Sequence, residues 1–450
     1  MLGLTAAIAR NTFLESIRQP IFFVLIAASA VFQVFNLLLS AYSMGYTEDT
    51  EVHGDDKLLL DMGLATVFVC ATLLAAFIAT SVLAREIDNK TALTVISKPV
   101  GRPLFILGKY LGVVGAILLA TLCMTLFFLF VIRHEVMSTV RDPVDQPVVV
   151  FAGLAVLLSL GVGIWGNFFY GWVFSSTAVT LLAPLLTLAY VVTLAFDKEW
   201  ALQPLATDFK PQVTLACLAV LLSMTVLAAI AIAASTRLGQ VMTIVVCAGA
   251  FILGLMSNYL VGRFAFDNEP VGRIVEVEPE FDDTTLAEPG DEAVVIIETP
   301  ARAEFPPGSS FYYGPDPAGV RLAVPPHEPF PGDVDDPFAL SDPAAPEALV
   351  VTRYEPLPRR FEIVNTGGLP VRRLPSEGDL VFTRPTDVNP AAVAAWAVVP
   401  NLQFFWLVDA ITQGHDVPPR YVVLLLLYTG FQATGLLALA TLLFQTRDVG

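Results

Sequence analysis

The tripeptide Gly108-Lys109-Tyr110 contains residue types that bind phosphate in nucleotide-hydrolysing enzymes. The phosphate-loop pattern G-x-x-x-x-G-K-[ST] needs a glycine at a fixed spacing before Gly-Lys and a hydroxyl after it to hold magnesium. Here the preceding glycine is Gly101, seven residues before Gly108, and Tyr110 stands at the hydroxyl position. We therefore expect this chain to bind no nucleotide and no other cofactor.

Other catalytic signatures are missing from the sequence. The four histidines, His53, His134, His327 and His415, lie in polar regions far from one another, and we expect them at the surface. They lack the short His/Cys spacings of a zinc site, and no Gly-x-Ser-x-Gly motif is present. The sequence thus favours a non-catalytic protein.

The elements around these residues are apolar runs. The chain has 450 residues, of which 55% are hydrophobic and 15% charged, and about 20 apolar residues cross a ~30 Å hydrocarbon core. We predict a polytopic α-helical membrane protein with eight spans. The spans are Ile21–Tyr42, Met62–Ala84, Tyr110–Ile132, Val148–Phe174, Ala178–Phe196, Thr214–Ala234, Val241–Val261 and Tyr421–Phe444.

The fourth and fifth spans form one apolar block that is too long for a single helix. We place the break at Ser175–Thr177, and a break near Gly166-Asn167 is an alternative. Neither choice changes the number of spans.

Basic residues fix the predicted orientation. Cytoplasmic loops of membrane proteins are enriched in Lys and Arg, and the loop from Arg85 to Lys109 holds five of them. With the amino terminus inside, nine Lys/Arg lie in cytoplasmic segments and five in the short opposite loops 43–61, 133–147 and 197–213. Both termini are then cytoplasmic.

A polar insertion separates the seventh and eighth spans. Between Arg263 and Arg420 lie 24 of the 32 prolines, with 26 Asp/Glu against 11 Lys/Arg, a net charge of −15 out of −17. Such a charge repels nucleic acid and anionic headgroups. Short alternating runs predict strands, and we expect an all-β, sandwich-like domain. The runs are Gly272–Glu278, Glu292–Glu298, Gly319–Val324, Leu349–Tyr354, Arg360–Val364 and Leu380–Thr383.

An aromatic segment follows this insertion. Residues Ala391–Thr412 are apolar but are interrupted by Pro400 and Asp409, so we expect an interfacial helix with Trp396 and Trp406 at headgroup level. The chain thus divides into an interfacial amino-terminal helix (1–20), spans 1–7 (21–262), an extracytoplasmic acidic Pro-rich β domain (263–390), an interfacial segment (391–420), and the eighth span with a cytoplasmic tail (421–450).

The predicted spans contain no Asp, Glu, Lys, Arg or His, and Asp61 and Lys109 are expected at the interface just beyond span ends. Ion-coupled carriers usually carry such residues inside their spans. Five amide side chains lie in the spans, and we expect them to hydrogen-bond between helices: Gln33, Asn36, Asn167, Asn258 and Gln432. The four cysteines, Cys70, Cys123, Cys217 and Cys247, all lie in spans and are expected to be small core residues.

Three stretches resemble the permease subunits of type-2 ABC exporters (ABC-2 type). They are the amino-terminal Ala9–Arg18, the loop with its Ser97-Lys98-Pro99-Val100-Gly101-Arg102 and Gly108-Lys109 motifs, and the carboxyl-terminal Phe444–Asp448. Together they frame the membrane region. The family's common six-span plan lacks the 263–420 insertion and has fewer spans.

The resemblance implies that the Arg85–Lys109 loop couples the chain to a separate ATPase subunit, which binds ATP and magnesium. The residues that match the motif are Arg85, Glu86, Asp88, Lys90, Thr91, Ser97, Lys98, Pro99, Arg102, Gly108 and Lys109. It also implies a second permease copy or a paralogue, in a bacterial inner membrane.

Two further features concern helix packing. Gly108, Gly112 and Gly115 open the third span at a spacing that lets helices approach closely. Residues Leu2–Gln19 are moderately amphipathic, with Leu2, Ala6, Phe13, Leu14 and Ile17 on one side of a helical wheel. We expect this helix to lie in the membrane interface.

The favoured function is export of a lipid or amphipathic molecule, since the spans lack charge. One alternative is a membrane anchor that displays the acidic β domain to an extracytoplasmic partner, although eight spans exceed what an anchor needs. A secondary carrier is a third hypothesis, which the uncharged spans disfavour.

Overall fold

The computed structural model describes residues 2–40, 48–84, 101–136, 144–278, 286, 288–301, 305–314, 330–371, 374–412 and 417–445. The chain forms two compact units. Unit 1 comprises residues 1–254 and 402–450 and is helical, whereas unit 2 comprises residues 255–401 and contains the β-sheet.

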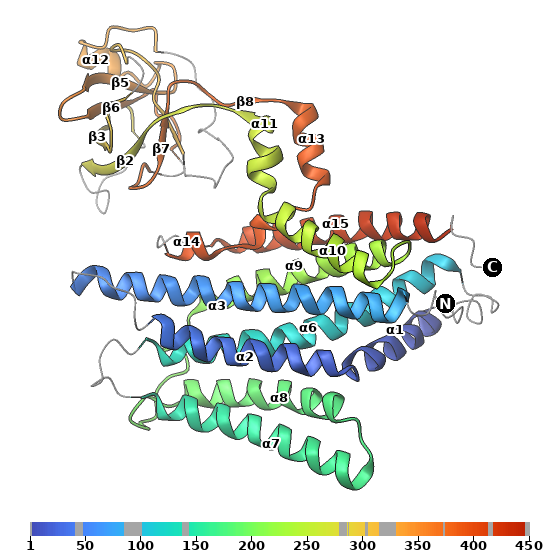
Figure 1. Cartoon of the computed structure of the whole chain (residues 1–450). Helices are drawn as coiled ribbons and strands as arrows, with labels where there is room; N and C mark the ends of the chain where they lie inside the picture. Colours follow the sequence, from blue (N-terminus) through green and yellow to red (C-terminus); the bar gives the residue numbers. More distant parts are fainter. Residues whose placement is uncertain are drawn as a thin grey trace. The chain divides into compact units, whose positions relative to one another are not determined.

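Unit 1 is a bundle of long helices that run back and forth (Figure 1). In chain order they are α1 (Leu2–Ile17), α2 (Pro20–Ser40), α3 (Glu48–Ala79) with the π-turn η1 (Thr80–Ala84), α6 (Arg102–His134), α7 (Gln146–Tyr170), α8 (Phe174–Leu194), α9 (Pro211–Ser235), α10 (Gln240–Leu255) and α15 (Pro419–Gln445). Two short elements, η3 (Gln403–Phe405) and α14 (Val408–Thr412), precede α15.

The polytopic membrane class is confirmed. Among the described residues, seven helices are long and apolar enough to cross a membrane, or eight if the broken pair Gln240–Leu255 and Asn258–Ala265 counts as one span. The pair corresponds to the predicted seventh span, which is broken after Leu255; the π-turn η2 (Asn258–Gly262) begins its second part.

The long apolar block breaks between the two predicted positions. Helix α7 ends at Tyr170, and α8 begins at Phe174. Gly171 takes a left-handed conformation (φ 67°) and its N–H donates to the Asn167 carbonyl. Glycine adopts this backbone conformation at little cost, which is why helices often end there.

Helices α3, α6 and α9 form the centre of unit 1, and α2, α7 and α15 expose more of their surface. Helix α7 packs mainly against α8. All four cysteines are buried and carry free thiols, as expected of core residues.

Unit 2 begins with η2 and α11 (Arg263–Ala265), and α13 (Pro390–Val398) packs against both of them. A ribbon of β1 (Phe266–Asp267) and β8 (Asp387–Val388) leads to the main sheet. The sheet strands are β2 (Pro270–Glu278), β3 (Glu292–Ile297), β4 (Tyr312–Gly314), β5 (Ala348–Glu355), β6 (Arg360–Thr366) and β7 (Leu380–Phe382). A single helical turn, α12 (Pro337–Leu340), precedes β5.

The expected all-β region is confirmed, and its strands form one antiparallel sheet in the order β4-β7-β2-β3-β6-β5. Residues 308–311 hydrogen-bond to the outer edge of β5, through Gly308 N to Val351 O (2.9 Å) and Phe311 N to Leu349 O (2.8 Å). The same segment continues into β4, which pairs with β7. It therefore joins the two edges and rolls the sheet into a closed module, which leaves these edge groups bonded.

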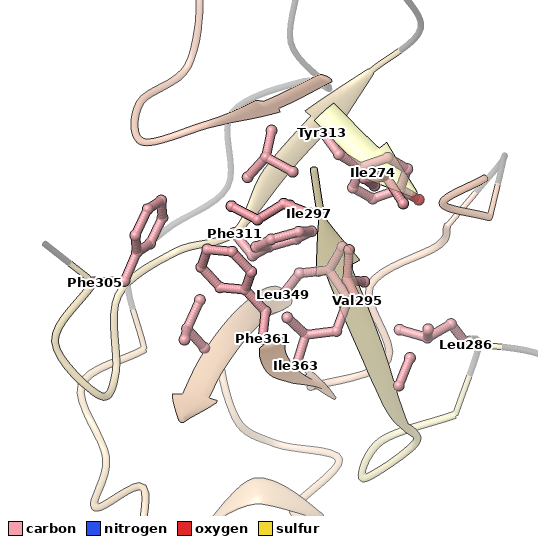
Figure 2. Close-up of a cluster of buried hydrophobic side chains, with 13 residues drawn as sticks. Ile274, Leu286, Val295, Ile297, Phe305, Phe311, Tyr313, Leu349, Phe361 and Ile363 are labelled. Atoms are coloured by element: carbon pink, nitrogen blue, oxygen red, sulfur yellow. The ribbon is translucent and has the colours of Figure 1, made fainter. Parts of the chain in front are cut away.

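The interior of this module is aliphatic and aromatic (Figure 2). Phe361 lies at its centre, with ring centroids 4.8 Å from Phe305, 5.6 Å from Phe311 and 4.4 Å from Tyr354. Alternate residues of β3 point into this core, which is the pattern that predicted the strand. The predicted strand Gly319–Val324 lies outside the described residues.

The aromatic segment 391–420 is not one interfacial helix. Its first part is α13 in unit 2, where Trp396 packs edge-on against Phe266. Its second part belongs to unit 1, where Leu402, Phe405 and Val408 are buried. Trp406 stacks on Phe68 of α3 at 6.2 Å. Pro400 divides the two parts because proline cannot continue a helix.

Candidate functional site

The predicted coupling loop starts and ends at described elements. It leaves the π-turn η1, Thr80–Ala84, and enters α6 at Arg102. Its central residues lie outside the described residues, including Arg85, Glu86, Asp88, Lys90, Thr91, Ser97, Lys98 and Pro99. The structure therefore places Arg102, Gly108 and Lys109 of the predicted set. It also places the helix ends before and after the loop and their contacts, which we call the frame.

The entry side of the frame is a corner between α1 and α2. Gln19 donates its amide to Ser81 Oγ in η1 at 2.5 Å, and Ser175 at the start of α8 donates to the Arg18 carbonyl at 2.9 Å. Single-turn π-helices interrupt regular helices and occur often at functional sites. Here the π-turn ends where the predicted loop begins.

The exit side is the first turn of α6, which is bonded to the end of α15. Arg102 Nη1 donates to the Gln445 carbonyl at 2.7 Å. The Phe105 ring stacks on Phe444 with centroids 5.8 Å apart. Helix carbonyls at a carboxyl terminus lack intrahelical donors, so an arginine there both satisfies them and complements the helix dipole.

Helix α1 covers the next turn of α6. A Cβ at Gly108 would lie 2.9 Å from Ile8 Cβ, and one at Gly112 would lie 2.5 Å from the Ala9 carbonyl oxygen. The glycines thus pack α6 against α1 inside the same chain. Gly115 is less tightly enclosed, since its Cβ would lie 3.4 Å from Phe13.

The buried face of α1 differs from the apolar face of its helical wheel. Thr5, Thr12 and Ser16 point inward and are buried, whereas Ala6 is exposed and Phe13 and Leu14 are partly exposed. Small hydroxyl residues allow the close approach to the glycines of α6. Of the larger apolar side chains on the predicted face, Ile17 is buried, whereas Phe13 and Leu14 remain partly exposed.

Lys109 is not at a loose interface position. It lies within α6 with 3% of its surface exposed, and its Nζ is 5.8 Å from the centre of the Phe105 ring. Tyr110, which stands where a phosphate loop has a hydroxyl residue, donates to the Thr225 carbonyl of α9 at 3.1 Å. Gly108-Lys109-Tyr110 therefore packs helices together.

These contacts bring together three stretches that are far apart in the sequence. Residues 5–12 of α1, the Arg102–Gly112 part of α6 and Phe444-Gln445 of α15 all meet in unit 1. Figure 1 shows α1, the start of α6 and the end of α15 at the same end of the bundle. They include described residues of the three stretches that carry the family resemblance, namely Ala9–Thr12, Arg102 with Gly108-Lys109, and Phe444-Gln445.

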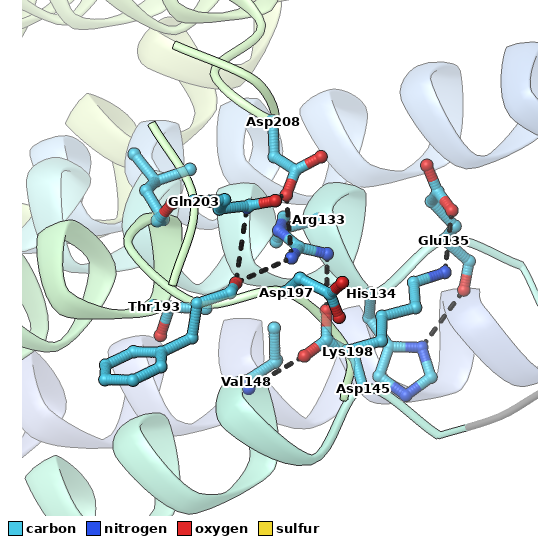
Figure 3. Close-up of polar contacts among 12 residues, drawn as sticks. Arg133, His134, Glu135, Asp145, Val148, Thr193, Asp197, Lys198, Gln203 and Asp208 are labelled. Carbon is cyan, nitrogen blue, oxygen red and sulfur yellow. Dashed lines mark hydrogen bonds and ion pairs between the residues drawn. The ribbon is translucent and has the colours of Figure 1, made fainter. Parts of the chain in front are cut away.

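A second polar cluster lies at the other end of α6, and the sequence did not reveal it. Arg133 in the last turn of α6 is 6% exposed and forms ion pairs with Asp145 Oδ2 (2.5 Å) and Asp208 Oδ2 (2.8 Å). Figure 3 shows its guanidinium group between the two carboxylates. Asp145 is fully buried and also caps α7 by accepting from Val148 N at 3.1 Å.

The loop from Ala195 to Lys210 closes over this cluster. Arg133 Nη2 donates to the Phe196 carbonyl at 3.2 Å, and Gln203 donates to Asp208. Lys198 pairs with Glu135 at 2.9 Å. Burial raises the pKa of Glu135, but the Lys198 hydrogen bond and the charges of Lys198, Lys210 and Arg133 outweigh burial and lower it.

Arg133 and Asp145 lie near the two ends of the loop 133–147. An Arg and an Asp at two neighbouring span ends are the sequence signal that could have predicted this ion pair. His134, expected at the surface, is also buried, with Nδ1 3.1 Å from the Glu135 carbonyl oxygen. Within the described parts of the chain, no three His, Cys, Asp or Glu side chains gather as a metal site would require.

The comparison with protein families concerns the amino-terminal part of the chain. Residues 6–165 match the family model described as ABC-2 family transporter protein. This range contains most of α1, then α2, α3, the predicted coupling loop, α6 and most of α7. Neither a curated protein nor a solved structure matches the chain. The resemblance to an ABC-2 type permease is thus confirmed over these residues.

Proposed function

We propose that the chain is the non-catalytic permease subunit of an ATP-driven exporter, and that a separate ATPase subunit binds the segment between η1 and α6. The meeting of the three family-like stretches at one end of unit 1 carries this proposal. The α1 and α15 stretches both contact α6, the helix that follows the segment and begins at Arg102. Transport as the general role agrees with the family match over residues 6–165.

The frame suits the transfer of force. The coupling segment is anchored at both ends on long central helices, α3 through η1 and α6 through Arg102. Helices α1 and α15 clamp the first turns of α6. A push on the segment therefore reaches four helices together, and rigid helices in a packed bundle shift as bodies.

ATP and magnesium belong to the ATPase subunit in this proposal. When that subunit closes on ATP, it pushes on the coupling segment, and the spans change between inward-open and outward-open arrangements. The coupling residues are those of the motif, from Arg85 to Lys109. A second permease copy or a paralogue completes the exporter.

The orientation follows from the excess of Lys and Arg at the coupling-segment end, which we assign to the cytoplasm of a bacterium. The chain then spans the inner membrane with both termini inside, and unit 2 lies outside. Unit 2 would receive the exported molecule or an extracytoplasmic partner. A lipid or another amphipathic molecule fits a bundle whose spans are mostly uncharged.

Copurification from the source cells tests the proposal. We expect tagged wild-type chain to retain an ATPase subunit, and Lys98→Glu, alone or with Arg102→Glu, to reduce the retained ATPase at least tenfold. Lys98→Glu is the cleaner variant because Arg102 also holds the end of α15. The matched control is the double reversal Arg353→Glu/Arg384→Glu on exposed strands and loops of unit 2.

If wild-type chain retains no ATPase, the exporter proposal is wrong. The anchor hypothesis would then be favoured, in which unit 2 alone binds a partner. Equal ATPase retention by the coupling-segment variants and the control would show that the ATPase binds elsewhere.

A further inference from the structure

Helix α2 carries a stripe of buried polar side chains on its inward face. Its buried residues are Phe22, Ile26, Ser29, Gln33, Asn36 and Ser40. The last four follow one another at intervals of four, three and four residues, so they lie on one face of the helix. At 1.5 Å per residue the stripe is about 16 Å long, roughly half of the hydrocarbon thickness.

Gln33 and Asn36 of this stripe form hydrogen bonds with α3. Gln33 Nε2 donates to the Gly63 carbonyl at 2.8 Å, and Asn36 Nδ2 donates to Thr66 Oγ1 at 3.1 Å. These bonds agree with the expectation that Gln33 and Asn36 link helices. They leave other polar atoms of the same stripe to be accounted for.

Two atoms of the stripe are without a partner. No described residue gives a hydrogen bond to Gln33 Oε1 or forms one with Ser29 Oγ, although both side chains are completely buried. Buried polar atoms are nearly always bonded, because loss of water without a replacement bond is unfavourable. In a hydrocarbon environment no outside water can relieve the deficit.

The seam is tightly packed on the Gly63 side of Gln33. A Cβ placed there would overlap the Phe128 ring of α6 and would lie 3.2 Å from Gln33 Oε1. A buried water needs space as well as two to four polar partners. A second arrangement of α2, α3 and α6 in which this oxygen meets a donor would remove the deficit.

We propose that the seam between α2 and α3, marked by Ser29, Gln33 and Asn36, opens during transport and binds the uncharged polar part of the exported molecule. This inference rests on the proposed function. In the closed arrangement described above, Gln33 and Asn36 hold the seam shut through Gly63 and Thr66. In the open arrangement the amides are released to bond the cargo.

The chemistry of the seam limits the cargo. Ser29, Gln33, Asn36, Ser40, Gly63 and Thr66 carry no charge. Amides and hydroxyls both donate and accept hydrogen bonds, so they bind hydroxyl, amide or ester groups. A full charge would be desolvated there without a counter-charge. The cargo class is an amphipathic molecule whose polar part is uncharged.

Cysteine labelling in membrane vesicles with the assembled exporter tests this inference. Cys70, Cys123, Cys217 and Cys247 are first replaced by alanine, and Gln33→Cys or Asn36→Cys is then introduced. The matched controls are Val31→Cys and Phe35→Cys on the outward face of α2, which are 54% and 53% exposed. The probes are hydroxyethyl, trimethylammonium-ethyl and sulfonatoethyl methanethiosulfonates, each scaled to its rate with a free thiol.

We expect labelling at positions 33 and 36 to be at least tenfold faster during ATP turnover than without ATP, and at least tenfold faster than at positions 31 and 35. The hydroxyethyl reagent should react fastest after scaling. Equal rates at the inward and outward positions in both conditions would overturn the inference, because the stripe would then be fixed packing. Faster reaction of either charged reagent would overturn the uncharged cargo class.

The outcome is separable from that of the proposed function. Retention of the ATPase is measured on the same vesicles by copurification. If the ATPase is retained and the seam stays unlabelled, the exporter proposal stands and the seam is only a contact between helices. If no ATPase is retained, the proposed function fails first.

Discussion

Replacing Arg133 with methionine should destabilise unit 1 far more than the loss of an ordinary ion pair. Arg133 is 6% exposed and bonds Asp145, which is fully buried, and Asp208. Methionine keeps much of the side-chain volume but leaves the Asp145 carboxylate without a counter-charge. Removal of one partner from a buried ion pair costs about 3–5 kcal/mol.

The matched control is Lys198→Met in the same cluster. Lys198 pairs with Glu135 at a similar distance, 2.9 Å, but these side chains are 31% and 50% exposed. Exposed ion pairs contribute about 0–1 kcal/mol, because water screens the charges. The two variants therefore test burial with the type of interaction kept constant.

A double variant isolates the pair itself. Asp145→Asn removes the charge and retains a good cap for α7, since Asn caps helices as well as Asp. Arg133→Met/Asp145→Asn should be at least as stable as Arg133→Met alone, because the second change removes the stranded charge. Independent effects would instead add.

The assay is equilibrium unfolding in mixed micelles by titration with a denaturing detergent. Tryptophan fluorescence is a suitable signal because Trp200 lies in the covering loop and donates to Gln146 Oε1 at 3.0 Å. The reasoning is refuted if Arg133→Met lowers the free energy of unfolding no more than Lys198→Met does.

Three further predictions follow from contacts in the two units. Gly112→Ala should weaken the α1–α6 contact by about 1–3 kcal/mol through overpacking, because the new Cβ would meet a backbone oxygen at 2.5 Å. Protease cleavage of α1 should therefore be faster in Gly112→Ala than in wild type. Gly115→Ala should leave the cleavage rate unchanged. Phe361→Ala should lower the stability of unit 2 by about 3–5 kcal/mol, whereas Phe338→Ala, at a side chain 89% exposed, should leave it unchanged. Thermal unfolding of the full chain measures both effects, and equal effects would contradict the assigned core. The lowered pKa of Glu135 means that its stabilising contribution is present above pH 4.5 and is lost as the pH falls through the lowered value. The difference in melting temperature between wild type and Glu135→Gln should therefore shrink on acidification below pH 4.5, and a difference that grows would contradict the reasoning.

Local patterns were enough for the membrane class and for most strands. A run of about 20 apolar residues has few alternatives to a membrane span, so each predicted span coincides with a candidate helix or with the broken pair, although the third of these helices begins at Arg102, before the predicted Tyr110. The alternation in Glu292–Glu298 and Arg360–Val364 likewise produced strands β3 and β6. The break at Gly171 fell between two predicted positions, because several small and polar residues there can end a helix.

The candidate site was predictable as a motif but not as a structure. The Arg85–Lys109 loop stands out by charge and by its Ser-Lys-Pro and Gly-Lys motifs. Nothing in that stretch indicates that Arg102 bonds the end of α15 or that Gly112 packs against Ala9. Such contacts join residues hundreds of positions apart, and their partners depend on how helices pack.

The sequence by itself determined where this chain is apolar, where it is acidic and which loop is basic, because these properties belong to each residue alone. Only the tertiary structure decided which polar groups are buried and with what partners. It placed Arg133 between two carboxylates, enclosed Lys109 within the bundle, closed the β-sheet through residues 308–311, and left Gln33 Oε1 unpaired in a tight seam. Burial and pairing depend on neighbours brought together by packing, and the order of residues along the chain does not specify those neighbours.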